Sequence, residues 1–184
     1  MANNAINSAV QLSGMGMLSI RHFPDDQGVR ETVAALGLEW PAQPGRFSGH
    51  PDTTEGHGVT LVWRSPQELL ALSRHGAALQ PLRDALAPGR LATAAAWNLG
   101  QGLVLFELQS PDLDAWLARL VDAAAIPQVN GHSSRCRLAD VAVVLLRLDK
   151  ERAWLLADKP ITAYVSNWLD YAHAALPPPA PAAH

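Results

Sequence analysis

Two histidines and two acidic residues lie close together in the sequence and could bind a metal ion. His50, Asp52, Glu55 and His57 fall in one short segment. Imidazole and carboxylate groups are common metal ligands, but a metal site needs ligands that rigid structure holds on a common face. Neither a helical spacing nor the alternation of a strand aligns these four side chains. The pattern therefore favours a solvated polar loop, and we predict no metal site.

The single cysteine and one isolated carboxylate are the other candidates for chemistry. Cys136 lies between Arg135 and Arg137, and nearby cations can lower a thiol pKa. Strand alternation would point both arginines away from the face of Cys136, which favours a buried and inert thiol. Asp140 lies between two apolar pairs, a position that also fits an ordinary turn between strands. Without a nucleophile, phosphate-loop or dinucleotide motif, we expect no catalytic or cofactor-binding residues.

A long aperiodic segment, residues 39–58, is the best candidate for contact with another protein. Loops of this length inside a compact domain are unusual and often functional. The segment carries Trp40 and Phe47, and buried aromatic side chains are frequent hot spots of protein interfaces. We predict that Trp40 and Phe47 form a partner interface and that the partner, not the chain's own domain, orders the loop.

The elements that would position these residues follow a repeated pattern of an apolar strand, a proline and an amphipathic helix. Proline suits the first turn of a helix, where its missing N–H costs no hydrogen bond. Ser65 and Glu68 have the spacing of a capping box. The four predicted strand and helix pairs are 18–22 with 25–36, 60–64 with 67–74, 103–109 with 112–124, and 154–157 with 161–175.

Predicted hairpins complete the fold class. The glycines at 100 and 102 suggest that strands 91–99 and 103–109 form one hairpin, and residues 135–157 carry three further strands. We therefore predict an α+β fold: two related lobes of antiparallel or mixed sheet with helices packed on one face. The predicted organisation is a flexible arm (1–16), one domain (17–176, with lobes of about 17–90 and 91–176) and a disordered Pro-rich tail (177–184).

Composition narrows the class of protein. The chain has 184 residues, a formal net charge of −3 and no basic stripe, which disfavours nucleic-acid binding. One cysteine excludes an intrachain disulfide framework and favours a reducing compartment. No signal-peptide pattern is evident, and no apolar run approaches the ~20 residues of a membrane helix. The sequence predicts a soluble, cytoplasmic protein.

The C-terminal third resembles a known family. Residues 136–147 read CRLADVAVVLLR, residues 153–157 read AWLLA, and residues 167–169 read NWL. This combination resembles the gamma subunit of heterotetrameric sarcosine oxidase, and the order of the earlier elements extends the resemblance to residues 17–176. The sequence departs from the family at Asp140, where a glycine is usual. The resemblance implies a fold similar to part of the folate-binding aminomethyltransferase family.

The resemblance also implies a function. In such complexes sarcosine is oxidatively demethylated to glycine, and the one-carbon unit passes to tetrahydrofolate. It implies alpha, beta and delta subunits as partners; FAD, FMN, NAD, zinc and tetrahydrofolate would lie on those subunits and not on this chain. We therefore expect a non-catalytic accessory subunit of a flavin-dependent oxidoreductase. The alternatives are the small subunit of an N-methylglutamate dehydrogenase-like complex and a free-standing folate-binding or aminomethyltransferase-like protein.

Overall fold

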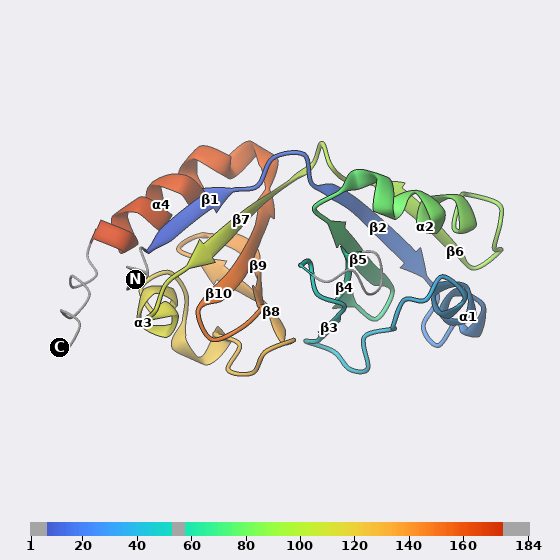
Figure 1. The fold of residues 1–184 in the computed structure, drawn as a ribbon, viewed down its shortest axis with the longest axis horizontal. Helices are drawn as coiled ribbons and strands as arrows, with labels where there is room; N and C mark the ends of the chain where they lie inside the picture. Colours follow the sequence, from blue (N-terminus) through green and yellow to red (C-terminus); the bar gives the residue numbers. More distant parts are fainter. Residues whose placement is uncertain (1–6, 53–57, 175–184) are drawn as a thin grey trace, which may run out of the picture.

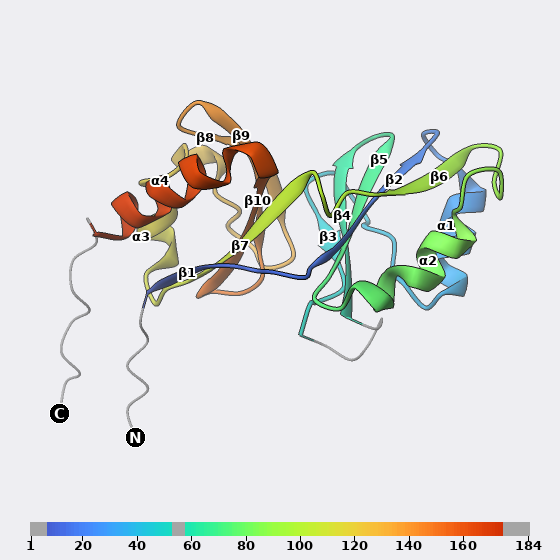
Figure 2. The ribbon, with the colours of Figure 1, turned by 90° about the horizontal axis from the view of Figure 1, so that it is seen from above.

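The computed structural model describes residues 7–52 and 58–174, which form two lobes side by side (Figure 1). Each lobe contains a five-stranded sheet whose paired strands are all antiparallel. Helices cover the outer face of each sheet, and the inner faces of the two sheets are turned toward each other (Figures 1 and 2). The predicted α+β class with helices on one face of each sheet is confirmed.

The N-terminal lobe has the strand order β3-β4-β5-β2-β6. In chain order its elements are β2 (Gly16–His22), α1 (Gln27–Ala35), β3 (Phe47–Ser48), β4 (Val59–Ser65), β5 (Glu68–Ser73), the 3-10 helix η2 (Gly76–Leu79), α2 (Gln80–Ala85) and β6 (Ala94–Asn98).

The C-terminal lobe has the strand order β1-β7-β10-β9-β8. Its elements are β1 (Ser8–Gln11), β7 (Leu103–Gln109), α3 (Leu113–Leu117), η3 (Ala123–Ala125), β8 (Ser133–Leu138), β9 (Val141–Arg147), β10 (Arg152–Asp158), η4 (Lys159–Ile161) and α4 (Thr162–Ala174).

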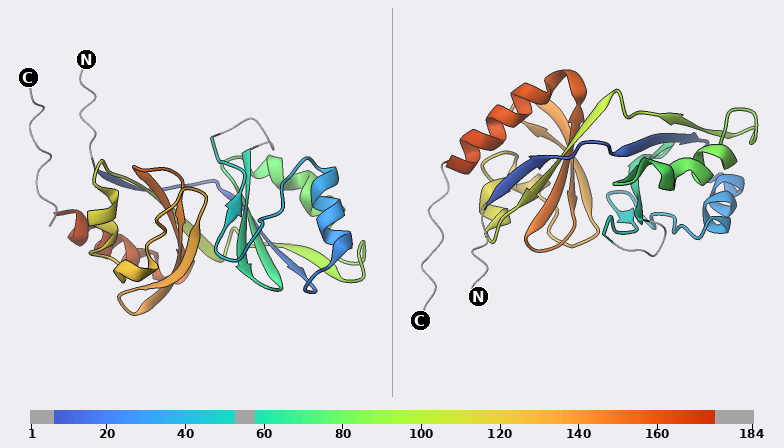
Figure 3. Two further views of the ribbon diagram at one scale, coloured as in Figure 1. Left: turned by 90° about the horizontal axis from the view of Figure 1, so that it is seen from below. Right: turned by 45° about the horizontal axis from the view of Figure 1, so that its top comes forward.

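The two lobes repeat one arrangement. Read from the other edge, the order β8-β9-β10-β7-β1 matches β3-β4-β5-β2-β6 position by position. In each lobe a strand, a helix, three strands and a second helical segment follow one another along the chain. The two orders differ in where their last strand comes from. Strand β6 follows α2 within its own lobe, whereas β1 comes from the start of the chain. The first strand of the protein thus completes the C-terminal sheet (Figure 3).

Three apolar clusters hold the layers together. Strand alternation divides the side chains between the faces, so that in β5 Leu69 and Ala71 face the helices while Leu70 and Leu72 face the other sheet. One cluster lies under α1 and α2, and a second lies under α3 and α4. The third cluster joins the two sheets and consists of Met17, Phe47, Val62, Leu70, Leu72, Leu105, Leu146, Leu148, Trp154 and Leu156.

One of the predicted strand and helix pairs is wrong. Residues 67–74 are not a helix: Ser65 and Glu68 close a hairpin between β4 and β5, and Glu68–Ser73 is the central strand of its sheet. The run from Leu69 to Leu72 is buried on both faces, so it lacks the polar alternation that marks a half-exposed strand. The helices after Pro24, Pro111 and Pro160 are present, although α3 is shorter than predicted.

The predicted domain boundaries also need correction. Residues 8–11 are the paired strand β1 and not a flexible arm. Strand β6 pairs with β2, so the predicted hairpin between 91–99 and 103–109 is wrong and the lobe boundary lies after residue 98. The glycine-rich segment 99–102 crosses from one sheet to the other beside segment 12–15 (Figures 2 and 3). The predicted tail 177–184 lies outside the described residues.

Among the helices of the described part of the chain, none combines the length and apolar character needed to span a membrane.

Candidate functional site

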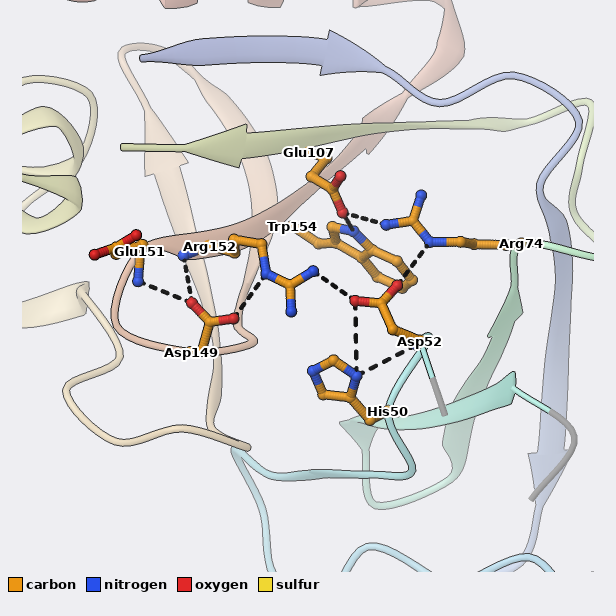
Figure 4. Close-up of polar contacts among 8 residues, drawn as sticks. All are labelled: His50, Asp52, Arg74, Glu107, Asp149, Glu151, Arg152 and Trp154. Atoms are coloured by element: carbon orange, nitrogen blue, oxygen red, sulfur yellow. Dashed lines mark hydrogen bonds and ion pairs between the residues drawn. The ribbon is translucent and has the colours of Figure 1, made fainter. Parts of the chain in front are cut away.

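A cluster of charged side chains lies where the two lobes meet (Figure 4). Arg74 of the N-terminal lobe forms ion pairs with Glu107 of β7 and, at 3.2 Å, with Asp52. Arg152 of β10 pairs with the other oxygen of Asp52 and, at 2.7 Å, with Asp149. We call these five residues, together with Trp154, the junction cluster.

Trp154 lies at the centre of the junction cluster. Its indole Nε1 donates a hydrogen bond of 3.0 Å to the carboxylate of Glu107. The guanidinium carbon of Arg74 lies 5.6 Å from the centre of its ring, a cation–π distance. The ring is fully buried in the cluster between the sheets. An arginine of one lobe is therefore held by a carboxylate and an aromatic ring of the other.

Local backbone structure brings the charged groups into place. Asp52 ends the described part of a loop that folds closely over β4 at Gly49. A Cβ atom at Gly49 would lie 2.1 Å from the carbonyl oxygen of Val59. The backbone φ of Gly49 is 74°, a conformation that favours glycine. On the other lobe, Asp149 accepts hydrogen bonds of 2.9 Å from the backbone N–H groups of Glu151 and Arg152. The turn between β9 and β10 thereby orients the Arg152 side chain.

The arginine neighbours of Asp52 and Asp149 lower the pKa of these two carboxylates. Burial raises the pKa of Asp52, but the hydrogen bond from Arg152 and the charges of Arg152 and Arg74 outweigh it and hold the pKa below its usual value. Burial likewise raises the pKa of Asp149. The hydrogen bonds that Asp149 accepts from Arg152 and from backbone N–H groups have the larger effect, so the pKa lies below its usual value. Carboxylates paired in this way are poor proton donors at neutral pH. The arrangement suits the joining of two lobes.

The predicted polar loop is only partly described. His50 lies beside Asp52, with Nδ1 4.0 Å from a carboxylate oxygen, and accepts a hydrogen bond of 3.3 Å from the Asp52 backbone N–H. Both oxygens of Asp52 are engaged by arginines, which leaves that carboxylate unsuited to a cation. Glu55 and His57 lie outside the described residues. Within 7–52 and 58–174, no group of three or more His, Cys, Asp or Glu side chains is arranged to hold a metal.

The structure places Trp40 and Phe47 on the chain's own core. Phe47 is 8% exposed and belongs to the cluster between the sheets. Its backbone N–H donates to Gly131 O at 3.0 Å, and Ser133 N–H donates to Gly45 O at 2.7 Å, so the C-terminal lobe holds the loop. The expectation that Phe47 awaits a partner is therefore wrong.

Trp40 is half-buried on the N-terminal lobe. Its ring meets the His22 ring edge to face at 5.1 Å and lies 5.3 Å from the guanidinium carbon of Arg30. Its own lobe therefore orders Trp40. Sequence reasoning treated an aperiodic loop as unsupported because the other lobe, which covers much of it, leaves no periodic trace in the sequence.

The two remaining candidates occupy ordinary structural positions. Cys136 is partly buried in β8 on the helix-covered face, and burial raises its thiol pKa, which disfavours the reactive thiolate. Asp140 lies in the turn between β8 and β9 after Ala139, whose φ is 47°. The turn explains Asp140 without a chemical role.

The residues of the junction cluster were missed in the sequence. Asp52, Arg74, Glu107 and Arg152 come from four distant segments, and no motif or spacing links them. The sequence held one weak signal, the charged residue Glu107 within the mainly apolar strand β7. In the structure, Glu107 pairs in register with Trp154 of β10. A charged residue in a buried strand requires a partner.

Fold and site together define a small two-lobed α+β protein whose best-formed polar cluster joins its lobes. No family model matches this chain. It is similar to sarcosine oxidase subunit gamma from an Arthrobacter species, 26% identical over 160 residues, which cover 83% of this chain and 72% of the relative. Subunit gamma from Corynebacterium sp. strain P-1 is 25% identical over 177 residues, covering 92% and 82%. The resemblance predicted from the sequence is confirmed.

Solved structures agree with this fold. Heterotetrameric sarcosine oxidase from Corynebacterium sp. U-96 contains a chain that matches with a TM-score of 0.79 at 21% identity, covering 95% of this chain and 87% of that one. Aminomethyltransferase T of the glycine cleavage system from Bartonella henselae matches with a TM-score of 0.61 at 13% identity, covering 90% of this chain and 46% of that one. The expected likeness to part of the aminomethyltransferase fold is present.

Proposed function

We propose that this chain is a non-catalytic accessory subunit of a heterotetrameric sarcosine oxidase-like complex. The observation that carries the proposal is its similarity to two proteins named sarcosine oxidase subunit gamma, over most of this chain and most of each relative. A match that extends along both chains supports a common role better than one shared domain does. The fold of the chain in the solved heterotetramer supports the same assignment.

The junction cluster supports an accessory role. Its carboxylates are neutralised by arginines, and its tryptophan is buried, so the cluster stabilises the arrangement of the lobes and offers no group to a substrate. In this proposal the chain presents a fixed surface to the alpha, beta and delta subunits of a cytoplasmic complex. The oxidation of sarcosine to glycine takes place on the other subunits.

The proposal places FAD, FMN, NAD, zinc and tetrahydrofolate on the other subunits. The local structure supports this for the dinucleotides. Gly14 lies between β1 and β2, and Gly16 is the first residue of β2. A strand therefore follows this glycine pair, whereas a dinucleotide-binding loop joins a strand to a helix. Calorimetric titration of the full chain with FAD, NAD or tetrahydrofolate should show no saturable heat at micromolar concentrations. Saturable binding of one of them would contradict the accessory role.

Purification from the native host tests the assembly. The full chain, carrying an affinity tag, should co-purify with two large flavin-containing chains, and the purified complex should consume oxygen in the presence of sarcosine. N-methylglutamate, offered as a matched substrate, distinguishes the related dehydrogenase. Recovery of the tagged chain as a single species without associated chains would contradict the proposal.

A further inference from the structure

The structure holds a cavity at the point where the chain crosses between the lobes. It measures about 660 Å³, within the range of roughly 300–1,000 Å³ typical of small-molecule sites. The two crossing segments, 12–15 and 99–102, form part of its wall. The ends of β1, β2, β6 and β7, together with η2, α2 and η4, supply the rest. We call this cavity the crossover pocket. Sites between domains are common positions for ligands.

We propose that the crossover pocket binds a small organic monoanion with an apolar body, of the class of the aryl carboxylates. Two cations line it, Arg83 from α2 of the N-terminal lobe and Lys159 from η4 of the C-terminal lobe. No aspartate or glutamate is among the described residues that line it. The lining therefore carries an uncompensated positive charge contributed by both lobes.

Neither cation is neutralised by another described residue. Arg83 donates to the side-chain oxygen of Gln80, and Lys159 Nζ lies 3.4 Å from the side-chain oxygen of Gln101. These neutral amides position the cations without cancelling their charge. Within the described ranges, no carboxylate lies within ion-pair distance of either side chain. Both residues are exposed to solvent. A carboxylate ligand would give them an ionic partner, with the guanidinium able to bind it through two hydrogen bonds.

The rest of the described lining is uncharged and only part of it is apolar. Its neutral polar side chains are Gln11, Ser13, Gln80, Asn98 and Gln101. Apolar side chains of Leu12, Met17, Leu79 and Leu103 line the pocket. A flat hydrocarbon body would bury surface against these side chains.

Glycines form part of the wall of the pocket. Gly16 and Gly76 line the pocket, and a Cβ atom on Gly16 would lie 2.7 Å from the Cα of Gly76, so the two backbones touch without side chains between them. A Cβ atom on Gly14 would meet no atom within 4 Å. This site goes beyond the proposed accessory role and does not depend on it, because it rests on this chain alone.

Titration of the full chain with benzoate at low ionic strength, followed by NMR, tests the proposal. We expect saturable shifts of the amide signals of Gly14, Gly76 and Gly100, and no comparable shifts with the neutral isostere benzamide. Arg83→Gln and Lys159→Gln should each raise the dissociation constant about fivefold or more, because each removes a charged contact. Arg90→Gln is the matched control: it removes the same charge from the same lobe, outside the pocket lining.

Several outcomes would overturn the inference. Benzoate that shifts no pocket signal, or shifts them equally in both pocket variants and wild type, shows that the cations bind no carboxylate. Equal binding of benzamide shows that charge is not recognised. Inorganic phosphate that competes as strongly as benzoate shows a plain anion site without selection for an apolar body. An equal loss in Arg90→Gln shows general charge attraction only. Dispersed spectra of each variant confirm that it folds.

Discussion

Glu107 carries two contacts of the junction cluster. Its carboxylate accepts the indole N–H of the buried Trp154 and pairs with Arg74. We expect Glu107→Ala to lower the free energy of unfolding by about 1–3 kcal/mol, because the indole N–H would be left buried without a partner. Glu107→Gln should cost less, since the amide oxygen can still accept from Trp154. Urea denaturation of the two variants measures the difference.

A matched surface variant controls for the loss of one charge. The Glu151 side chain is exposed, and only its backbone N–H contributes to the turn. Glu151→Ala should change the free energy of unfolding by no more than about 0.5 kcal/mol. If Glu107→Ala is as mild as Glu151→Ala, the cluster does not hold the lobes together as described.

Asp52 should make stability depend on pH. Its pKa in the folded protein lies below the usual value, because Arg152 and Arg74 outweigh the effect of burial. A lowered pKa means that Asp52 stabilises the fold above its unfolded pKa, near 4, and that this contribution disappears as pH falls through the folded pKa. The carboxylate is about one-third exposed, with 36% of its side-chain surface accessible, so solvent limits the effect to under about 1 kcal/mol.

The comparison of wild type with Asp52→Asn isolates this contribution. The difference between their free energies of unfolding should be constant from pH 7 to about 5 and should shrink toward pH 3. Denaturant unfolding at each pH measures it. A difference that does not change with pH would show that the Asp52 carboxylate gains nothing from its arginine neighbours.

At the scale of elements, β1 is a four-residue strand that completes the other half of the molecule. It pairs with β7, with Ser8 opposite Gln109. The buried hydroxyl of Ser110 also donates a hydrogen bond of 2.6 Å to the Asn7 side chain. A chain that begins at residue 12 should lose about 2 kcal/mol or more of unfolding free energy, because these backbone bonds disappear and the edge of β7 is uncovered. Chemical denaturation compares the two chains.

Addition of the missing strand is the decisive control for that truncation. A synthetic peptide of residues 7–14 should restore part of the lost stability when it is present in excess. A peptide of the same composition in scrambled order should not. A truncated chain as stable as the full one would show that β1 is dispensable.

The predictability of each element depended on the residues that flank it in the sequence. The hairpin of β9 and β10 was predicted, because the charged residues from Asp149 to Arg152 separate two apolar runs. Strand β5 was read as a helix, because it is apolar on both faces and follows a Ser-Pro pair typical of helix starts. Strand β1 is polar and short, and only the long-range partner β7 defines it. Strands β5 and β10 are both buried on two faces, so the residues that flank each apolar run, and not its burial, determined which of the two was predicted correctly.

At the scale of the whole molecule, the candidate site was beyond sequence reasoning. The pattern of strands and helices predicted the α+β class, and the family resemblance led to the proposed accessory role, while the junction cluster and the crossover pocket depend on residues far apart in the chain. Asp52 and Arg152 form an ion pair, and Arg83 and Lys159 line one pocket, only because the lobes face each other. Contacts between lobes are set by tertiary packing and leave no spacing to detect.

The two lobes should unfold together. They share the apolar cluster between the sheets, which includes Leu70 and Trp154, and the chain crosses between them twice. The C-terminal lobe lacks a complete sheet within one continuous segment, because β1 comes from the start of the chain, whereas all five strands of the N-terminal sheet lie within residues 16–98. We expect a single denaturation transition, with coincident midpoints by far-UV circular dichroism and by tryptophan fluorescence. Two transitions, or a fragment of residues 99–174 that folds with native stability by itself, would show that the lobes are independent domains.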